Sequence, residues 1–260
     1  MTNPRLTVLA HDVFRTSAMA TREAFMGAAT VSGAVDLARF ADDSAQFATR
    51  NSSETEQPAC RRGCTSCCHL HVGALAPEAI AIATALRQAL TADGLGRLSE
   101  RIDDHIARTN GTDASGRRGL RLPCPLLDEQ GDCLAYEARP LSCRGWNSLD
   151  AALCEADLRD PSRDNPARLN LTQYVLAGRI LEGLSAGSHA LGRDHRRLDL
   201  VRALDILLKD DEAANRWLQG SDVLEGAANE RVFPDPDDAK SIDARQKLWN
   251  SLGPGFVSES

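Results

Sequence analysis

The stretch CRRGCTSCC, residues 60–68, places four thiols within nine residues. Side chains that form a hydrophobic core recur with the regular period of a helix or a strand. These four cysteines have no such period, so their spacing is not that of a core. Clustered thiolates of this kind usually hold a metal ion or an iron–sulfur cluster. The stretch therefore predicts a metal site, and its candidate ligands are Cys60, Cys64, Cys67 and Cys68.

A second cluster of cysteines follows in the segment CPLLDEQGDCLAYEARPLSCR, residues 124–144. A thiolate site needs several sulfurs within about 2.3 Å of one ion, so two distant clusters can share a site only if the fold joins them. We expect a helical hairpin over residues 77–109 to return the chain for this purpose. The second cluster adds the candidate ligands Cys124, Cys133 and Cys143.

The number of thiols and the adjacent pair Cys67 and Cys68 narrow the kind of site. Neighbouring side chains point in different directions, so both members of the pair rarely ligate one ion easily. Either one binds and the other supports it, or the pair bridges a larger cluster. Seven thiols also exceed the four that one zinc ion or one cubane needs. The surplus could serve a second metal or redox exchange.

Charged residues beside the thiols bear on their ionisation. Arg61, Arg62 and Arg144 flank the two clusters. Positive charge favours the thiolate, so we expect these arginines to lower the pKa values of the thiols.

The bulk composition indicates a mainly α-helical fold. The chain has 260 residues, long enough for one large or two small domains, and 42% of them are hydrophobic. Only 4% are aromatic, which favours helices over a β-sandwich. We expect a helical domain with a small irregular metal-binding core that contains a β-hairpin. The predicted division is an N-terminal helical segment, the cysteine-cluster domain, a C-terminal helical region and a surface tail, at residues 1–58, 59–150, 151–230 and 231–260.

Apolar spacing and turn residues give the expected elements. Gly94 and Gly96 are expected to break the helical hairpin, and Asn110 with Gly111 to end its second helix. Gly131 is expected to adopt a positive φ in the turn of the β-hairpin. The expected helical regions are 13–50, 77–90, 98–108, 169–184 and 198–208, the expected loops are 51–58 and 112–119, and the expected β-hairpin is 124–136.

The net charge of the chain and its N-terminal segment limit the partners and the cellular compartment that we expect. A net charge of −7 and a pI of about 5.4 argue against general nucleic-acid binding, and we interpret the small basic patch Arg117, Arg118 and Arg121 as a solvated loop. No secretory signal or apolar run of membrane-spanning length is present, so we expect a reducing cytoplasm and no membrane. There, clustered cysteines are more often metal-binding than disulfide-bonded, although eight cysteines also permit a disulfide framework. Heavy use of Arg, Ala and Leu suggests a bacterial genome.

Taken together, the cysteine pattern resembles a known family. The first cluster, then Cys124-Pro-x-Leu, Gly131-x-Cys133, Tyr136-x2-Arg139-Pro140 and Cys143-Arg144, is similar to the bacterial YkgJ-type cysteine-cluster family. This family is also described as the CxxCxxCC zinc- or iron-chelating domain. The similarity spans about residues 60–146. It implies metal or iron–sulfur binding through the seven cysteines and implies little about a reaction. Flagellin lysine N-methylases carry a similar cluster, but no matching methyl-donor motif is present.

Several residues near the clusters have two interpretations each. His69 and His71 could be auxiliary ligands or hydrogen-bonded histidines beside the site. Arg139 could face the charge of a thiolate cluster or an acidic substrate, or tie the hairpin to the helices. We expect Trp146 to pack over the cluster, and we interpret Cys154, outside the family pattern, as an ordinary buried cysteine.

Three functional hypotheses follow. The first is a metal-binding protein that holds an iron–sulfur cluster or zinc, with iron preferred because of the surplus thiols. The second is a metal-dependent oxidoreductase or an enzyme that modifies protein or RNA, which needs an open coordination position or a spare thiol. The third is a zinc-stabilised domain that docks on a partner protein. The sequence identifies no catalytic residue.

Overall fold

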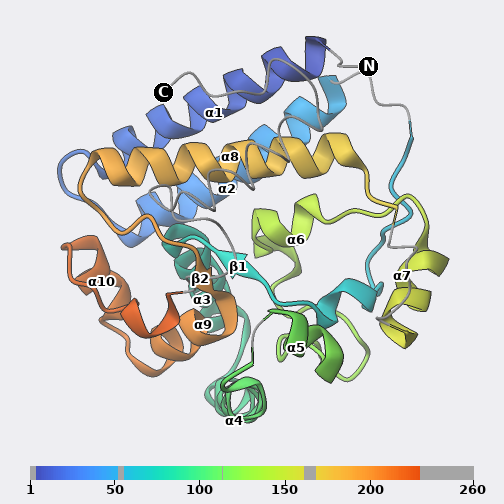
Figure 1. Ribbon diagram of the computed structural model, residues 1–260. Helices are drawn as coiled ribbons and strands as arrows, with labels where there is room; N and C mark the ends of the chain where they lie inside the picture. Colours follow the sequence, from blue (N-terminus) through green and yellow to red (C-terminus); the bar gives the residue numbers. More distant parts are fainter. Residues whose placement is uncertain (1–3, 52–55, 113, 161–167, 229–260) are drawn as a thin grey trace.

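The computed structural model describes residues 4–51, 56–112, 114–160 and 168–228, and the chain is mainly helical there, as expected (Figure 1). The tail predicted for residues 231–260 lies outside the described residues. The long helices are α1 Pro4–Phe25, α2 Val31–Asn51, α3 Ala76–Ala89, α4 Ala92–Thr109, α8 Leu171–Ala190 and α9 Leu200–Lys209. The shorter elements are η1 Ser66–His69, β1 Gly73–Ala74, α5 Ala114–Leu120, η2 Tyr136–Ala138, α6 Leu141–Gly145, α7 Ala151–Arg159, β2 Leu198–Asp199, α10 Ala213–Leu218 and η3 Glu225–Ala227.

Helices α1, α2 and α8 pack together at one side of the molecule, and each contacts the other two (Figure 1). Small residues let α1 and α8 approach closely. A Cβ added at Gly187 of α8 would lie 2.6 Å from the carbonyl oxygen of Ala18, and one at Gly183 would overlap the carbonyl oxygen of Phe14. Two glycines four residues apart therefore form the seam of this layer.

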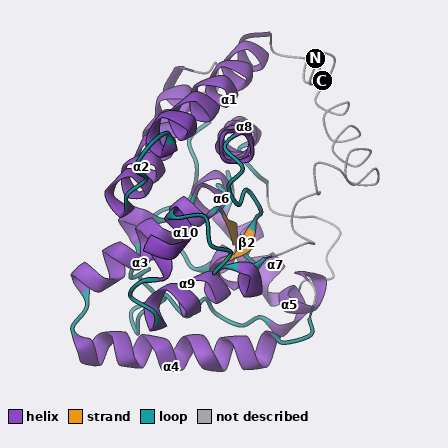
Figure 2. Ribbon diagram, turned by 90° about the vertical axis from the view of Figure 1, so that its left-hand side faces the viewer, coloured by secondary structure: helices purple, strands orange, loops and turns teal. Residues whose placement is uncertain are grey.

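A second layer lies beneath the first and continues the same core. Helix α3 contacts α2 and α9, and α4 contacts α9 along the far edge of the molecule (Figure 2). The largest fully buried side chains gather on these helices, as their apolar periodicity requires. They include Ile80, Ile82, Leu86, Leu98, Ile102 and Leu204.

The two strands join distant parts of the chain. Strands β1 and β2 are antiparallel, with Gly73 opposite Asp199 and Ala74 opposite Leu198. This pair fixes the segment that leaves the first cysteine cluster to the start of α9. The β-hairpin predicted for residues 124–136 is wrong in extent, because that segment forms one isolated bridge between Leu127 and Cys133.

Local hydrogen bonds within that segment explain why no longer hairpin forms. The Asp128 carboxylate accepts hydrogen bonds from the backbone N–H groups of Gln130 and Asp132, which curls the chain into a compact turn. Gly131 has the expected positive φ of 82°. Outside the turn, the N–H of Leu127 bonds the carbonyl of Cys124 and the N–H of Tyr136 bonds the carbonyl of Cys133, both at 3.1 Å, so these groups close local turns and do not extend a ladder.

Other expected boundaries shift for local reasons. The helical region 13–50 is confirmed, but it is two helices, because α1 ends where Gly27 adopts a φ of 95°. The prediction that Gly94 and Gly96 break the helical hairpin of residues 77–109 is wrong. They lie inside α4, which begins after Thr91, whose hydroxyl accepts a hydrogen bond from the Gly94 N–H.

Among the remaining predicted elements, the end of α4 and the two C-terminal helices are confirmed and one loop is wrong. Asn110 and Gly111 end α4 as expected, with a φ of 72° at the glycine. The loop expected at residues 112–119 instead contains α5. Helices α8 and α9 confirm the two helical regions predicted in the C-terminal half.

Candidate metal centre

The first cysteine cluster is wound into consecutive tight turns. Cys64 donates its N–H to the carbonyl of Arg61 at 3.1 Å, and Gly63 between them has a φ of 79° that favours glycine. Cys67 and Cys68 then lie on the single-turn helix η1, where the Cys68 N–H bonds the carbonyl of Thr65 at 2.8 Å. Short turns therefore hold the four cysteines of this cluster near one another.

The second cluster reaches the first through its backbone. The N–H of Cys124 donates to the carbonyl of Cys68 at 2.7 Å, a contact between the two cysteine motifs themselves. Cys133 is bridged to Leu127, whose N–H in turn donates to the carbonyl of Cys124 at 3.1 Å. The two clusters thus meet, as we expected from the sequence.

Helix α6 carries the third cysteine of the second cluster, Cys143. Gly145 allows α6 to approach α8 closely, since a Cβ there would lie 2.6 Å from the Cβ of Ala177. Arg144 joins the same helix to α2 through an ion pair with Asp42 at 3.0 Å. Close packing and one ion pair therefore hold Cys143 against the helical layer.

An aromatic ring links the loops of the two clusters. Tyr136 carries the guanidinium of Arg139 over its ring at 3.9 Å and that of Arg62, from the first cluster, at 5.1 Å. Arg62 also pairs with Asp132 at 3.7 Å. The two contacts of Arg62 connect the first cluster to the loop of the second, and Arg139 contacts Tyr136 within that second loop. We call Arg62, Tyr136 and Arg139 the arginine–tyrosine latch.

The pKa values of Cys67, Cys124, Cys133 and Cys143 are raised, so the expected lowering by the arginines is wrong for these four thiols. Burial raises the pKa of Cys124 to about 12 and raises that of Cys133, where Arg139 and Arg144 lower it by less. The pKa of Cys143 lies well above its usual value because of burial and then the neighbouring charges of Cys124, Cys67 and Cys133. A hydrogen bond with Cys68 is the first cause that raises the pKa of Cys67, followed by burial. Desolvation outweighs the arginines at these sites.

A buried carboxylate that sequence reasoning missed positions the Cys143 helix. Glu78, 3% exposed, accepts hydrogen bonds from the N–H of Leu75 at 2.9 Å and from that of Leu141, the first residue of α6, at 2.7 Å. It therefore caps the N-termini of α3 and α6 together. Burial raises the pKa of Glu78, and the charge of Arg197 acts in the opposite direction.

A second buried acid anchors the segment that follows the first cluster. Asp199 caps α9 by accepting from the N–H of Val201 at 3.0 Å, and it also pairs with Arg117 and with Nε2 of His71 at 3.3 Å. Arg117 is thus not part of an open basic patch. His69 contacts the carbonyl of Thr65 through Nδ1 at 3.2 Å, so each of the two histidines has a polar contact through one ring nitrogen.

Cys154 is less buried than we expected. It is half-buried on α7, and α7 contacts η1, the helix of Cys67 and Cys68. Burial raises the pKa of Cys154, and the side chain of Ser148 acts in the opposite direction. The fold therefore adds an eighth thiol to the region of the clusters. Trp146, expected over the clusters, makes its ring contact with Tyr174 of α8 at 5.9 Å.

The donor chemistry of the region fits a thiolate-bound metal. All eight cysteines are free, and soft thiolates suit zinc and iron–sulfur clusters. In the part of the chain that the structure describes, no group of three or more His, Cys, Asp or Glu side chains has an arrangement that could hold a metal ion. The backbone contact between Cys124 and Cys68 brings the two cysteine motifs into one region, but the described side chains are not arranged around an ion.

Comparison with known families agrees with this donor set. Residues 59–158 match the family model described as "CxxCxxCC: Putative zinc- or iron-chelating domain". We call residues 59–158 the CxxCxxCC domain after this match. The match confirms the resemblance read from the cysteine pattern, and it reaches into α7 and so includes Cys154. No curated protein and no solved structure matches the chain. No described helix has the length and apolar character needed to cross a membrane.

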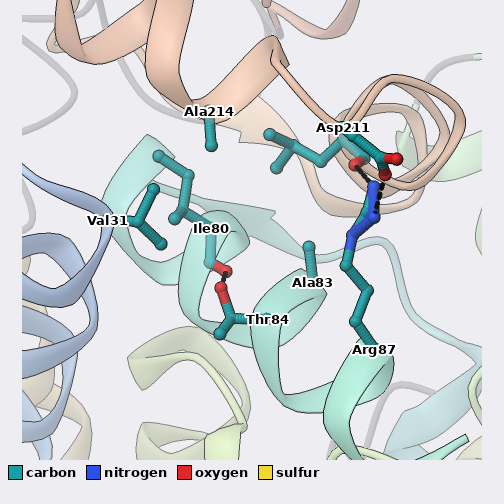
Figure 3. A pocket seen from close by; sticks show the side chains of 8 residues that line it. Val31, Ile80, Ala83, Thr84, Arg87, Asp211 and Ala214 are labelled. Atoms are coloured by element: carbon teal, nitrogen blue, oxygen red, sulfur yellow. Dashed lines mark hydrogen bonds and ion pairs between the residues drawn. The ribbon is translucent and has the colours of Figure 1, made fainter.

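A cavity of about 330 Å³ lies between α2, α3, α9 and α10, away from the cysteines (Figure 3). Its charged residues, Arg87 and Asp211, pair with each other, and Arg87 also donates to the carbonyl of Leu207 at 2.7 Å. The rest of its lining is mostly aliphatic, and no cysteine lines it. Its chemistry is therefore unrelated to that of the thiols.

Proposed function

We propose that the CxxCxxCC domain of this chain binds a metal through thiolates, as an iron–sulfur cluster or as zinc. The observation that carries the proposal is the backbone contact from Cys124 to Cys68, which brings two sets of free thiols to one place. The proposed ligands are the seven cysteines of the family pattern: Cys60, Cys64, Cys67, Cys68, Cys124, Cys133 and Cys143.

The charge around the thiols supports the same proposal. Several thiolates around one ion leave a net negative charge, which a nearby cation stabilises. The charge of Arg139 acts to lower the pKa values of four thiols, Cys60, Cys67, Cys133 and Cys143. Its guanidinium lies over the ring of Tyr136. We infer that Arg139 faces the metal centre.

The choice between iron and zinc rests on the number of thiols. A structural zinc site is closed by four ligands, whereas this region offers more thiols and an adjacent pair. We therefore favour iron. An iron–sulfur centre would supply electron transfer and zinc a structural crosslink. Free thiols persist in a reducing compartment, so the proposal includes the cytoplasm.

Anaerobic purification followed by metal and sulfide analysis and a visible spectrum tests the proposal. We expect iron with acid-labile sulfide and the broad charge-transfer absorption of thiolate-bound iron. Zinc alone, with a colourless protein, would overturn the iron version and leave metal binding in place. A chain that holds neither metal after anaerobic reconstitution would overturn the whole proposal.

Chelation separates a structural metal from a catalytic one. If the metal folds the domain, its removal should make residues 56–75 and 121–150 sensitive to protease while the helices remain. If the centre is enzymatic, the domain should stay folded, and either an exogenous ligand should reach an open position on the metal or a thiol should react with an alkylating agent while the metal is bound.

A further inference from the structure

We propose that the cavity between α2, α3, α9 and α10 binds a small aliphatic carboxylate, whose apolar chain lies along α3 and whose carboxylate pairs with Arg87. No cysteine lines the cavity, so this inference is independent of the proposed metal. Ligand sites have volumes of about 300–1,000 Å³ and combine mostly apolar walls with a few placed polar groups. At about 330 Å³ this cavity suits a small ligand, and its lining has both parts.

The apolar part is a wall along one face of α3. Ile80, Ala83 and Arg87 line the cavity, and residues three, four and seven apart share a face of a helix. At 1.5 Å of rise per residue this face is about 10 Å long. Leu207 of α9 and Val31 of α2 complete the wall. Because Ile80 and Leu207 are almost fully buried, the wall offers apolar contacts to an extended chain of several methylene groups.

The polar part is a guanidinium that is held in place at one end. In Figure 3 Arg87 and Asp211 lie together, at the opposite end of the cavity from Val31. Nη2 of Arg87 donates to the carbonyl oxygens of Leu207 at 2.7 Å and Leu208 at 3.3 Å, in the last turn of α9. The backbone thus fixes a planar cation whose fork of N–H groups matches the two oxygens of a carboxylate.

The exposure of the two charged partners favours an anionic ligand over an amine. The side chain of Asp211 is 86% exposed and that of Arg87 is 31% exposed. Such an exposed ion pair contributes little, so Asp211 can turn to solvent and give its place to a ligand carboxylate while Arg87 stays on the carbonyls. Thr84 donates its hydroxyl to the carbonyl of Ile80 at 2.8 Å, so the wall does not require a donor or acceptor along the ligand chain.

Titration calorimetry of the full chain with octanoate tests the site. We expect one molecule per chain, and an affinity that rises about fourfold with each methylene from butanoate to octanoate as that group is buried. Octylamine has the same chain and the opposite charge, and it should not bind. In methyl NMR spectra the signals of Ile80 and Leu207 should shift on binding, whereas that of Ile102, buried on α4, should not.

Variants separate the carboxylate contact from the chain contact. Arg87→Gln removes the cation and should weaken octanoate binding about tenfold or more. Asp211→Asn removes the competing carboxylate and should tighten binding about two- to fivefold. Ala83→Leu fills the cavity and should abolish binding. The exposed Arg97→Gln on α4 also removes an arginine and is the matched control, which should bind as the wild type does.

The fold of each variant is checked by far-ultraviolet circular dichroism and thermal unfolding, because Arg87 also supports the end of α9. Asp211→Asn changes only an exposed side chain, so it remains informative if the other two variants do not fold. The proposal would be overturned by a wild type that does not bind octanoate, by octylamine binding as well as octanoate, or by an unchanged affinity in Asp211→Asn. None of these outcomes would bear on metal binding by the cysteines.

Discussion

The helical frame, α1, α2, α3, α8 and α9, and the cysteine core, residues 56–75 and 121–150, are built on different principles. The frame buries Ile80, Leu176 and Leu204 almost completely and allows glycines where its helices cross. The core has short helical turns, the two-residue strand β1 and two isolated bridges, and its cysteines are half-buried. Apolar burial alone can hold the frame, whereas the core depends on turns, capping acids, the latch and the proposed metals.

The largest effect is expected where the frame meets the core. Glu78→Ala leaves the buried N–H groups of Leu75 and Leu141 without their acceptor and removes the carboxylate that faces Arg197. Each unsatisfied buried donor costs about 1–3 kcal/mol, so the free energy of unfolding should fall by about 3–5 kcal/mol. Urea unfolding measures it, with the exposed Glu100→Ala on α4 as a control that should change little. A small change in Glu78→Ala would mean that frame and core are joined elsewhere.

The second junction should respond to pH. Burial acts to raise the pKa of Asp199, but His71 and Arg117 outweigh it, and the pKa lies well below its usual value. Because the folded-state pKa is depressed, the stabilisation is fully present above the unfolded value of about 3.9 and is lost as the pH falls further.

Asp199→Asn should therefore be less stable than the wild type at pH 7, by about 2–3 kcal/mol for a buried charge-paired carboxylate, and the difference should shrink in acid. Urea unfolding of both proteins at pH 7 and at about pH 3 measures this. Asp205→Asn, on the same helix, is the matched control. A difference that is independent of pH would show that the carboxylate acts by shape rather than charge.

Within the frame, the glycine seam gives a smaller effect. Gly183→Ala places a Cβ against the backbone carbonyl of Phe14, which cannot rotate away, so α1 must shift. Overpacking of this kind costs about 1–3 kcal/mol. Gly178→Ala on the same helix has open space around its Cβ and should stabilise by up to about 1 kcal/mol. Thermal unfolding of the two variants should therefore shift in opposite directions, and equal shifts would exclude a close α1–α8 contact.

The contrast between frame and core also explains what could be predicted from the sequence. Helix α8 was predictable because its apolar side chains repeat with the helical period, and the two cysteine motifs because their spacing is local. Glu78 was not, since an acid in a first helical turn is common and its second partner, Leu141, lies 63 residues away. The place of Cys154 near the clusters was not predictable either, because only the fold brings α7 against η1. Long-range polar contacts leave no periodic signal.

The smallest effect is expected in the arginine–tyrosine latch of the core. Tyr136→Leu keeps an apolar side chain but removes the ring that carries Arg62 and Arg139. Cation–π contacts at partly exposed sites contribute about 0.5–1 kcal/mol each, so global stability should fall by about 1–2 kcal/mol at most. Tyr136→Phe retains the ring and should match the wild type.

Because Arg62 comes from the first cluster and Arg139 from the second, loss of the ring should loosen the contact between the two clusters before it loosens the frame. Hydrogen exchange should therefore speed up at the N–H of Cys124, which bonds Cys68, while the amides of α8 remain protected. Equal acceleration in both places would show that core and frame open as one unit.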